Sequence, residues 1–202
     1  MRVVEASGYT EPRDALAQNW YPFMAKVLPE ADWLPIPNLK DEVLSYIKKW
    51  QLNGFILTGG NDLFEAPARD QTELAIIKYA EENNLPLLGV CRGLQIICHY
   101  YGQEIIPCPE RHEHVATTHQ VKLTKPYEED RCIEVNSYHQ LCIGFSGDLK
   151  EPLKPLALSH DGVLEAVTNC SNILGIMWHP ERESPSSSFD KKIIRNHFSL
   201  EE

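Results

Sequence analysis

A cysteine between two glycines most constrains how this chain can fold. Residues 87–95 read Leu-Leu-Gly-Val-Cys-Arg-Gly-Leu-Gln, so an apolar run passes into the start of an amphipathic segment. This spacing is typical of a nucleophile elbow, the sharp strand-to-helix turn that presents a reactive side chain above a sheet. Gly89 and Gly93 avoid the collisions that larger side chains would make at such a bend. The pattern therefore predicts that Cys91 is a nucleophile at a strand-to-helix turn.

The predicted turn would also affect the ionisation of the thiol. The first amide groups of the following helix, together with its dipole, favour a thiolate at Cys91, and the thiolate is the reactive form. The alternative is a buried structural cysteine in an ordinary strand–helix unit. A second chemical group elsewhere in the chain is needed to favour one interpretation.

The C-terminal part of the sequence supplies such a group. Residues 173–181 read Ile-Leu-Gly-Ile-Met-Trp-His-Pro-Glu, an apolar run that ends at His179. Pro180 holds the residue before it extended, and residues two apart in an extended segment point to the same side. His179 and Glu181 should therefore lie side by side, as the base and its orienting carboxylate in a catalytic triad with Cys91.

An oxyanion site should accompany such a triad. In elbow enzymes one donor is the amide after the nucleophile, here Arg92, and the other comes from a loop after a neighbouring strand. Residues 53–62 read Asn-Gly-Phe-Ile-Leu-Thr-Gly-Gly-Asn-Asp, so we expect the second donor at Gly60. An ordinary strand–helix turn would explain the two glycines equally well.

Apolar periodicity predicts one domain over residues 1–202, of the α/β class. We expect a three-layer, doubly wound, mostly parallel sheet flanked by helices, with a small antiparallel layer at one edge. The expected helices span residues 13–27, 40–51, 68–83, 92–101 and 189–198. The expected strands span residues 33–37, 54–58, 85–90, 119–123, 132–136, 156–159, 164–168 and the apolar run before His179.

Charge and composition exclude several classes of function. A net charge of −10 argues against a general nucleic-acid binder, which needs a basic face. No apolar run is long enough for a membrane span, and the first residues lack a signal-peptide pattern. The six cysteines show no disulfide framework, which favours a reducing cytoplasm. Cys108, His112 and His114 match no tight zinc spacing, so we expect a solvent-facing loop there. We expect neither a metal nor an organic cofactor, because the Cys91 thiol would supply the covalent chemistry.

Five motifs, spread over nearly the whole chain, resemble the class I glutamine amidotransferase superfamily, whose catalytic domain carries a Cys-His-Glu triad. Among its branches, the free-standing γ-glutamyl hydrolases are the most similar. These include the γ-glutamyl-γ-aminobutyrate hydrolases and the γ-glutamyl-CDP-amidate hydrolases, which are linked to phosphoramidate decoration of bacterial capsules. The motifs are Thr58-Gly59-Gly60-Asn61-Asp62, Gly89-Val90-Cys91-Arg92-Gly93-Leu94-Gln95, Val135-Asn136-Ser137-Tyr138-His139-Gln140, Asp161-Gly162-Val163-Leu164-Glu165-Ala166 and Met177-Trp178-His179-Pro180-Glu181.

The resemblance implies cysteine-dependent hydrolysis of a γ-glutamyl amide through a γ-glutamyl thioester. It also implies a small-molecule substrate and leaves a homodimer open. The implied substrate-binding residues are Gly59, Asn61, Gln95, Asn136, Ser137, Tyr138 and His139. His139 is expected to be a pocket or structural residue and not a second base. Asp161 and Glu165 would bind the substrate amine or shape a turn, and Arg69 and Asp70 would reach the leaving group or cap a surface helix.

The chain departs from the family pattern at two points. Relatives open with a strand ending near Gly-Ile-Ser or Gly-Ile-Thr, so the start at Met1-Arg2-Val3-Val4 predicts a first strand that is missing or lies upstream. Residues 102–105 read Gly-Gln-Glu-Ile where the γ-aminobutyrate hydrolases have Gly-Gly-Ser-Leu. Two alternative functions stay open: a glutaminase subunit that delivers ammonia to a separate synthetase chain, and a catalytically silent scaffold.

Overall fold

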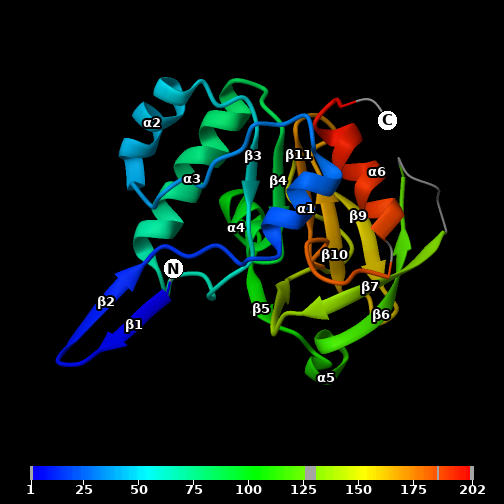
Figure 1. Ribbon diagram of the computed structural model, residues 1–202. Coiled ribbons are helices and arrows are strands. Elements are labelled where there is room, and N and C mark those ends of the chain that lie inside the picture. Colours follow the sequence, from blue (N-terminus) through cyan, green and yellow to red (C-terminus); the bar gives the residue numbers. More distant parts are fainter. Residues whose placement is uncertain (1, 126–130, 186, 201–202) are drawn as a thin grey trace.

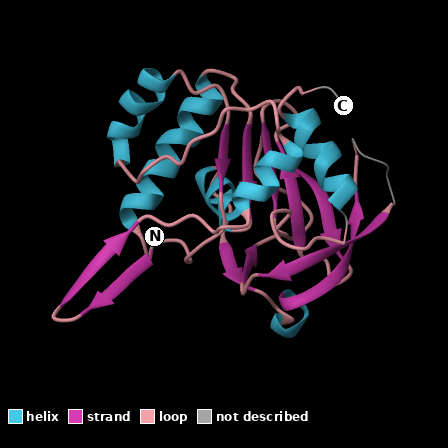
Figure 2. Cartoon of the chain, viewed as in Figure 1, coloured by secondary structure: helices cyan, strands magenta, loops and turns pink. Residues whose placement is uncertain are grey.

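The computed structural model describes residues 2–125, 131–185 and 187–200 (Figures 1 and 2). Within these ranges, seven strands form a curved sheet in the order β3-β4-β11-β10-β9-β6-β7, and most of the buried apolar side chains form one core around it. The strands are β3 (Phe55–Leu57), β4 (Leu87–Val90), β11 (Ile173–Ile176), β10 (Leu164–Thr168), β9 (Lys154–Ser159), β6 (Val115–Leu123) and β7 (Cys132–Tyr138).

The predicted α/β class is confirmed, and the parallel part of the sheet lies where the elbow was expected. Strand β4 pairs in parallel with β3 on one side and with β11 on the other. The antiparallel strands form a larger part than the small edge layer we expected, because β10, β9, β6 and β7 continue the same sheet. The connections between β9, β10 and β11 are short turns, and parallel pairing would need a crossover of a dozen or more residues.

Helices cover both faces of the sheet, as a doubly wound fold requires. A Cβ on Gly175 of β11 would lie 2.4 Å from the Leu94 side chain, so this face packs against helix α4 (Arg92–Tyr100). The alternate residue Leu174 shares a small apolar gap with Ile193 of helix α6 (Ser187–His197), on the other face. Helix α1 (Trp20–Val27) packs beside α6 (Figure 1), and α3 (Pro67–Glu82) packs beside α4.

The N-terminal region differs from the sequence prediction. Residues 13–19 are not helical, because Arg13 ends β2 (Tyr9–Arg13), which forms a hairpin with β1 (Arg2–Ala6). The hairpin projects away from the main sheet (Figure 1). The strand expected over residues 33–37 is absent, since Pro35 and Pro37 have no backbone N–H to donate to a ladder.

The remaining predicted helices and strands are confirmed within a few residues at their ends. The helix expected over residues 40–51 consists of a 3₁₀ turn, η1 (Lys40–Glu42), followed by α2 (Val43–Trp50). Three short elements that the sequence did not predict are β5 (Ile105–Pro107), its antiparallel partner β8 (Leu141–Ile143) and helix α5 (Arg111–His114). None of the helices in the described residues is both long and apolar enough to cross a membrane.

Close packing of α4 on β11 leads to a stability prediction. In a Gly175→Ala variant the new methyl group would meet the end of the Leu94 side chain at 2.4 Å and Val167 Cγ2 at 3.1 Å, so Leu94, the helix or the strand must shift. We expect a loss of about 1–3 kcal/mol in the free energy of unfolding, the usual cost of overpacking. Urea denaturation measures it. Gly144→Ala is the matched control, because its nearest neighbour would lie at an ordinary 3.4 Å; equal effects of the two substitutions would contradict this packing.

Candidate active site

Cys91 occupies a strained turn between β4 and α4, as predicted. Its φ of +53° and ψ of −105° are unusual for a residue other than glycine, and such strain is tolerated only where the surroundings enforce it. The Cys91 amide donates a hydrogen bond to the Ile176 carbonyl at 2.8 Å, which anchors the turn to β11. Any side chain at Gly93 would meet the Leu57 carbonyl at 2.1 Å, so glycine is required there.

The Cys91 thiol is less acidic than we expected. Burial raises its pKa to about 12, although a hydrogen bond from the Arg92 amide lowers it. The charge of Glu181 also raises this pKa, and the charge of Arg182 lowers it. Desolvation of the anion therefore outweighs the helix amides, so Cys91 is a thiol at neutral pH and needs a base to remove its proton.

His179 and Glu181 lie side by side as their spacing predicted. The distance between His179 Nδ1 and Glu181 Oε1 is 2.7 Å, and both side chains are buried. Because an ionised carboxylate can only accept, Nδ1 carries the proton and Nε2 has the free electron pair. Between β11 and this pair, the Trp178 side chain is fixed by a hydrogen bond from its indole N–H to Asp190 of α6, at 2.8 Å.

Three neighbouring strands bring the predicted groups to one edge of the sheet. Val90 pairs with Ile176, so Cys91 and the segment leading to His179 leave adjacent parallel strands at their carboxyl ends. Strand β3 ends at the same edge, and a Cβ on Gly59 would lie 2.7 Å from His179 Cε1. Ligand sites of α/β sheets typically lie at this edge.

Arg69 holds the glycine loop that follows β3. Its guanidinium donates to the carbonyl oxygens of Thr58 at 2.6 Å and Gly59 at 3.3 Å, and it pairs with Glu73 at 2.7 Å. A Cβ on Gly60 would collide with this guanidinium. The surface role considered for Arg69 is therefore wrong: it is buried and positions the backbone that we expect to contribute an oxyanion donor.

The side chain of Arg92 also forms buried ion pairs. It is almost fully buried and pairs with both Asp70 and Glu73 of α3, which fixes the start of α4 against α3. Asp70 is therefore buried too, and its second oxygen accepts from the Phe64 amide at 3.1 Å. Only the Arg92 backbone is available to a substrate, which agrees with the role predicted for its amide.

Asn136 contacts the backbone that carries the histidine. Its side-chain oxygen accepts from the His179 amide at 2.8 Å, and its NH₂ group donates to the carbonyls of His179 at 2.9 Å and Glu183 at 3.0 Å. This side chain holds the His179 segment in place instead of reaching into a pocket. The sequence signal was present in the Asn-Ser-Tyr-His motif, but its partner lies 43 positions later.

The other predicted substrate-binding residues separate into buried and exposed groups. Ser137 donates to the His114 carbonyl at 2.8 Å, and the Gln95 NH₂ donates to the Leu141 carbonyl at 3.0 Å. His139 is buried in a separate cluster of histidines around Glu165. Asn61 is exposed and donates to Glu65 at 3.3 Å. The backbone of this region and the exposed side chains are therefore the groups that a substrate can reach.

Tyr138 and Arg182 lie next to His179 and Glu181. The Tyr138 ring packs edge-on against His179, with 5.7 Å between ring centroids, and is 43% exposed. The Arg182 guanidinium lies 4.2 Å from the centre of the same ring. Sequence analysis did not select Arg182, although it directly follows Glu181. The Arg182 Nε lies 3.9 Å from Glu181 Oε1, and the charge of Arg182 lowers the pKa of Cys91.

Comparisons with known proteins identify related sequences. A γ-glutamyl-CDP-amidate hydrolase of Campylobacter jejuni is 35% identical to the chain over 206 residues, covering 98% of the chain and 95% of that protein. The γ-glutamyl-γ-aminobutyrate hydrolase PuuD of Escherichia coli is 28% identical over 185 residues, covering 80% and 68%.

The similar solved structures have the same fold. A Thermoplasma acidophilum protein thought to be part of a GMP synthase has a TM-score of 0.67 at 22% identity, covering 89% of this chain and 87% of its own. A glutamine amidotransferase of Thermotoga maritima has a TM-score of 0.57 at 15% identity, covering 83% and 67%. The peptidase C26 family model matches residues 9–181, a span that includes the elbow and the His179–Glu181 pair. The chain therefore belongs to the peptidase C26 family, with a class I glutamine amidotransferase-like fold.

Proposed function

We propose that this protein hydrolyses γ-glutamyl amides, with Cys91 as nucleophile and a Cys91-His179-Glu181 triad. The observation that carries the proposal is the buried 2.7 Å contact between His179 and Glu181 beside the strained turn at Cys91. Family membership and the names of the relatives support γ-glutamyl amide hydrolysis as the reaction class.

The proposed reaction begins with transfer of the Cys91 proton to His179 Nε2. The sulfur attacks the γ-carbonyl carbon, and the resulting oxyanion accepts hydrogen bonds from the amides of Gly60 and Arg92. His179 then gives the proton to the leaving nitrogen as the C–N bond breaks, which leaves a γ-glutamyl thioester. In the second half, His179 removes a proton from water, the hydroxide attacks the thioester, and glutamate and the thiol are released.

The high pKa of Cys91 gives Glu181 a defined role. Burial makes an isolated Cys91 thiolate costly. The thiolate therefore forms more readily when the imidazolium that results from the proton transfer stays beside the sulfur. A carboxylate hydrogen-bonded to Nδ1 stabilises that imidazolium and keeps Nε2 directed to the reacting atoms.

An anionic leaving group would suit the side chains beside His179. Arg182 and Tyr138 supply a cation and an aromatic ring there, a combination that can bind a phosphate and stack a base. We therefore propose a γ-glutamyl-CDP-amidate as substrate, in line with the Campylobacter jejuni relative. A γ-glutamyl-γ-aminobutyrate is the alternative, in line with the Escherichia coli relative.

Cys91→Ala tests the nucleophile. We expect kcat/KM on γ-glutamyl substrates to fall by roughly a thousandfold or more, because the covalent route is lost. Intact-mass analysis of quenched wild-type enzyme should detect one glutamyl adduct, absent from Cys91→Ala. Cys132→Ala, at an exposed thiol, is the control and should keep full activity. Unchanged turnover in Cys91→Ala would refute the proposed chemistry.

The same assay separates the hydrolase from a glutaminase that serves a synthetase. The substrate panel should contain glutamine, γ-glutamyl-γ-aminobutyrate and γ-glutamyl-CDP-amidate. We expect the isolated chain to turn over a substrate with a large leaving group faster than glutamine. Activity on glutamine alone, and only with a synthetase chain present, would favour the glutaminase function.

Glu181→Gln tests the orienting carboxylate. The amide keeps the size of the side chain but removes the charge beside His179 Nδ1, so kcat should fall by about a hundred- to ten-thousandfold. Steady-state kinetics measure this loss, and the melting temperature shows whether the fold is kept. Glu183→Gln, an exposed neighbour, is the matched control and should behave like wild type. A similar kcat for the two variants would exclude this role for Glu181.

A further inference from the structure

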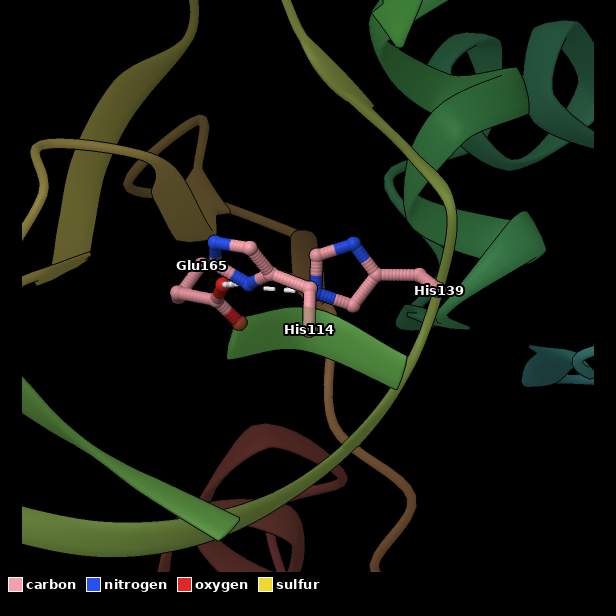
Figure 3. A group of neighbouring side chains, drawn as sticks. All are labelled: His114, His139 and Glu165. Atoms are coloured by element: carbon pink, nitrogen blue, oxygen red, sulfur yellow. Dashed lines mark ion pairs between the residues drawn. The ribbon is translucent and has the colours of Figure 1, made fainter. Parts of the chain in front are cut away.

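A second group of titratable side chains is buried among elements of the antiparallel part of the fold. It consists of His114 at the end of α5, His119 on β6, His139 just after β7 and Glu165 on β10. All four side chains are buried, with exposures of 0%, 7%, 3% and 0%. Figure 3 shows that the His114, His139 and Glu165 side chains come from different elements and point toward one another.

One nitrogen of each of the three histidines lies close to the same carboxylate oxygen. His114 Nδ1 and His119 Nε2 each lie 3.5 Å from Glu165 Oε1, and His139 Nε2 lies 3.4 Å from the same oxygen. Among the described residues none of these three nitrogens has a hydrogen-bond partner, and neither do the two Glu165 oxygens. Their contacts with Glu165 are at ion-pair distance only, and buried polar atoms without a hydrogen bond are costly.

The outward-facing nitrogens, in contrast, all have acceptors. His114 Nε2 lies 3.0 Å from Asp161 Oδ2, His119 Nδ1 lies 3.1 Å from the Glu113 carbonyl, and His139 Nδ1 lies 3.1 Å from the Leu141 carbonyl. A carbonyl or carboxylate oxygen can only accept, so each outward nitrogen carries a proton. If the imidazoles are neutral, the inward nitrogens direct free electron pairs at the Glu165 carboxylate, and these electron pairs repel its oxygens. A cation bound between them would attract both the nitrogens and the carboxylate.

This is the arrangement that metal-binding histidines adopt. A ligating histidine almost always donates its other N–H to a carboxylate or a backbone carbonyl, which fixes its tautomer. Zinc bonds of about 2.0–2.1 Å in a tetrahedron place the ligand atoms about 3.3–3.4 Å apart, close to the distances to Glu165 Oε1. The ligand atoms of His114, His139 and Glu165 all lie within 4.8 Å of one another.

We infer that His114, His139 and Glu165 bind one divalent transition-metal ion, with Zn²⁺ as the ion that the ligand set favours. Two imidazoles and a carboxylate suit zinc better than Ca²⁺ or Mg²⁺, which prefer oxygen ligands. All three ligands are buried and none of them belongs to the proposed triad, so we assign the ion a structural role and no part in the hydrolysis.

The position of the cluster gives the ion a clear structural task. The Ser137 hydroxyl and the His139 amide donate to the His114 carbonyl, and the Met177 amide donates to the Glu165 carbonyl at 2.8 Å. The ion would therefore link α5, β10 and the residue just after β7, next in the chain to the segment that bears Asn136 and Tyr138. It would hold the backbone around His179 in place.

The sequence analysis expected no metal because it grouped His114 with Cys108 and His112, its neighbours in the chain. His112 is exposed and lies outside the cluster. Cys108 lies 3.4 Å from the outward nitrogen of His139 and not among the inward atoms. The missing ligands are distant in sequence, since Glu165 follows His114 by about fifty positions. Asp161 contacts His114, and Glu165 would bind the ion. These roles take the place of the substrate contacts that we considered for Asp161 and Glu165.

Metal binding to the full-length chain, purified without a histidine tag, tests this inference. Cys91→Ser, Cys132→Ser and Cys170→Ser in the parent remove the elbow thiol and both exposed thiols as competing ligands. After chelator treatment, we expect one equivalent of Zn²⁺ to bind and the melting temperature to rise with Zn²⁺ concentration. Co²⁺ should bind in the same ratio and give the intense visible bands of a four-coordinate ion.

Two ligand variants and one control complete the experiment. His139→Gln and Glu165→Gln should weaken Zn²⁺ binding by more than the ten- to hundredfold that loss of an outer hydrogen-bond partner costs. His112→Gln, on the same helix as His114, should bind like the parent. Circular dichroism establishes that each protein is folded, and either ligand variant alone suffices.

The competing explanation is that protons, not a metal, occupy the cluster. A folded parent that binds neither Zn²⁺ nor Co²⁺ stoichiometrically would overturn the inference, as would equal affinity of His139→Gln and His112→Gln. This test measures binding and stability only, so its failure is independent of the proposed hydrolase activity.

Discussion

Parallel pairing of β4 with β11 is the constraint on which the candidate site depends. It sets Val90 opposite Ile176, and so delivers Cys91 and the His179 segment to the same edge of the sheet. The Cys91 amide extends this pairing by one hydrogen bond to Ile176, which forces the strained turn. A shift of one residue in either strand would turn its side chains to the opposite face of the sheet. Cys91 and His179 would then no longer lie together.

Buried polar contacts hold the segments of the candidate site in position. The Arg92–Asp70–Glu73–Arg69 network holds the start of α4 and the glycine loop, and Asn136 holds the backbone of His179. Buried ion pairs contribute little net stability, but loss of one partner leaves an uncompensated charge and costs about 3–5 kcal/mol. Rigid placement is their main effect, and catalysis depends on such placement within about an ångström.

Local signals in the sequence predicted the site better than distant ones. The Gly-Val-Cys-Arg-Gly turn and the His-Pro-Glu spacing depend on residues adjacent in the chain, so backbone geometry alone predicts them. The partners of Asn136 and Arg92 depend on pairing between distant segments, which no local pattern encodes. The acidity of Cys91 was misjudged for a related reason: the helix amides are visible in the sequence, but burial is not. Whether Cys91, His179 and Glu181 act as a triad remains a prediction.

Alkylation of Cys91 tests most directly whether the buried thiol depends on His179. Peptide mass spectrometry would follow the rate of modification by iodoacetamide against pH, in wild type and in His179→Asn. Because burial raises the Cys91 pKa to about 12, we predict that the variant reacts slowly at neutral pH and that its rate keeps rising with pH. The wild type should react faster at neutral pH, since the imidazole removes the proton. Equal rates in both proteins at every pH would contradict the coupling of the two residues.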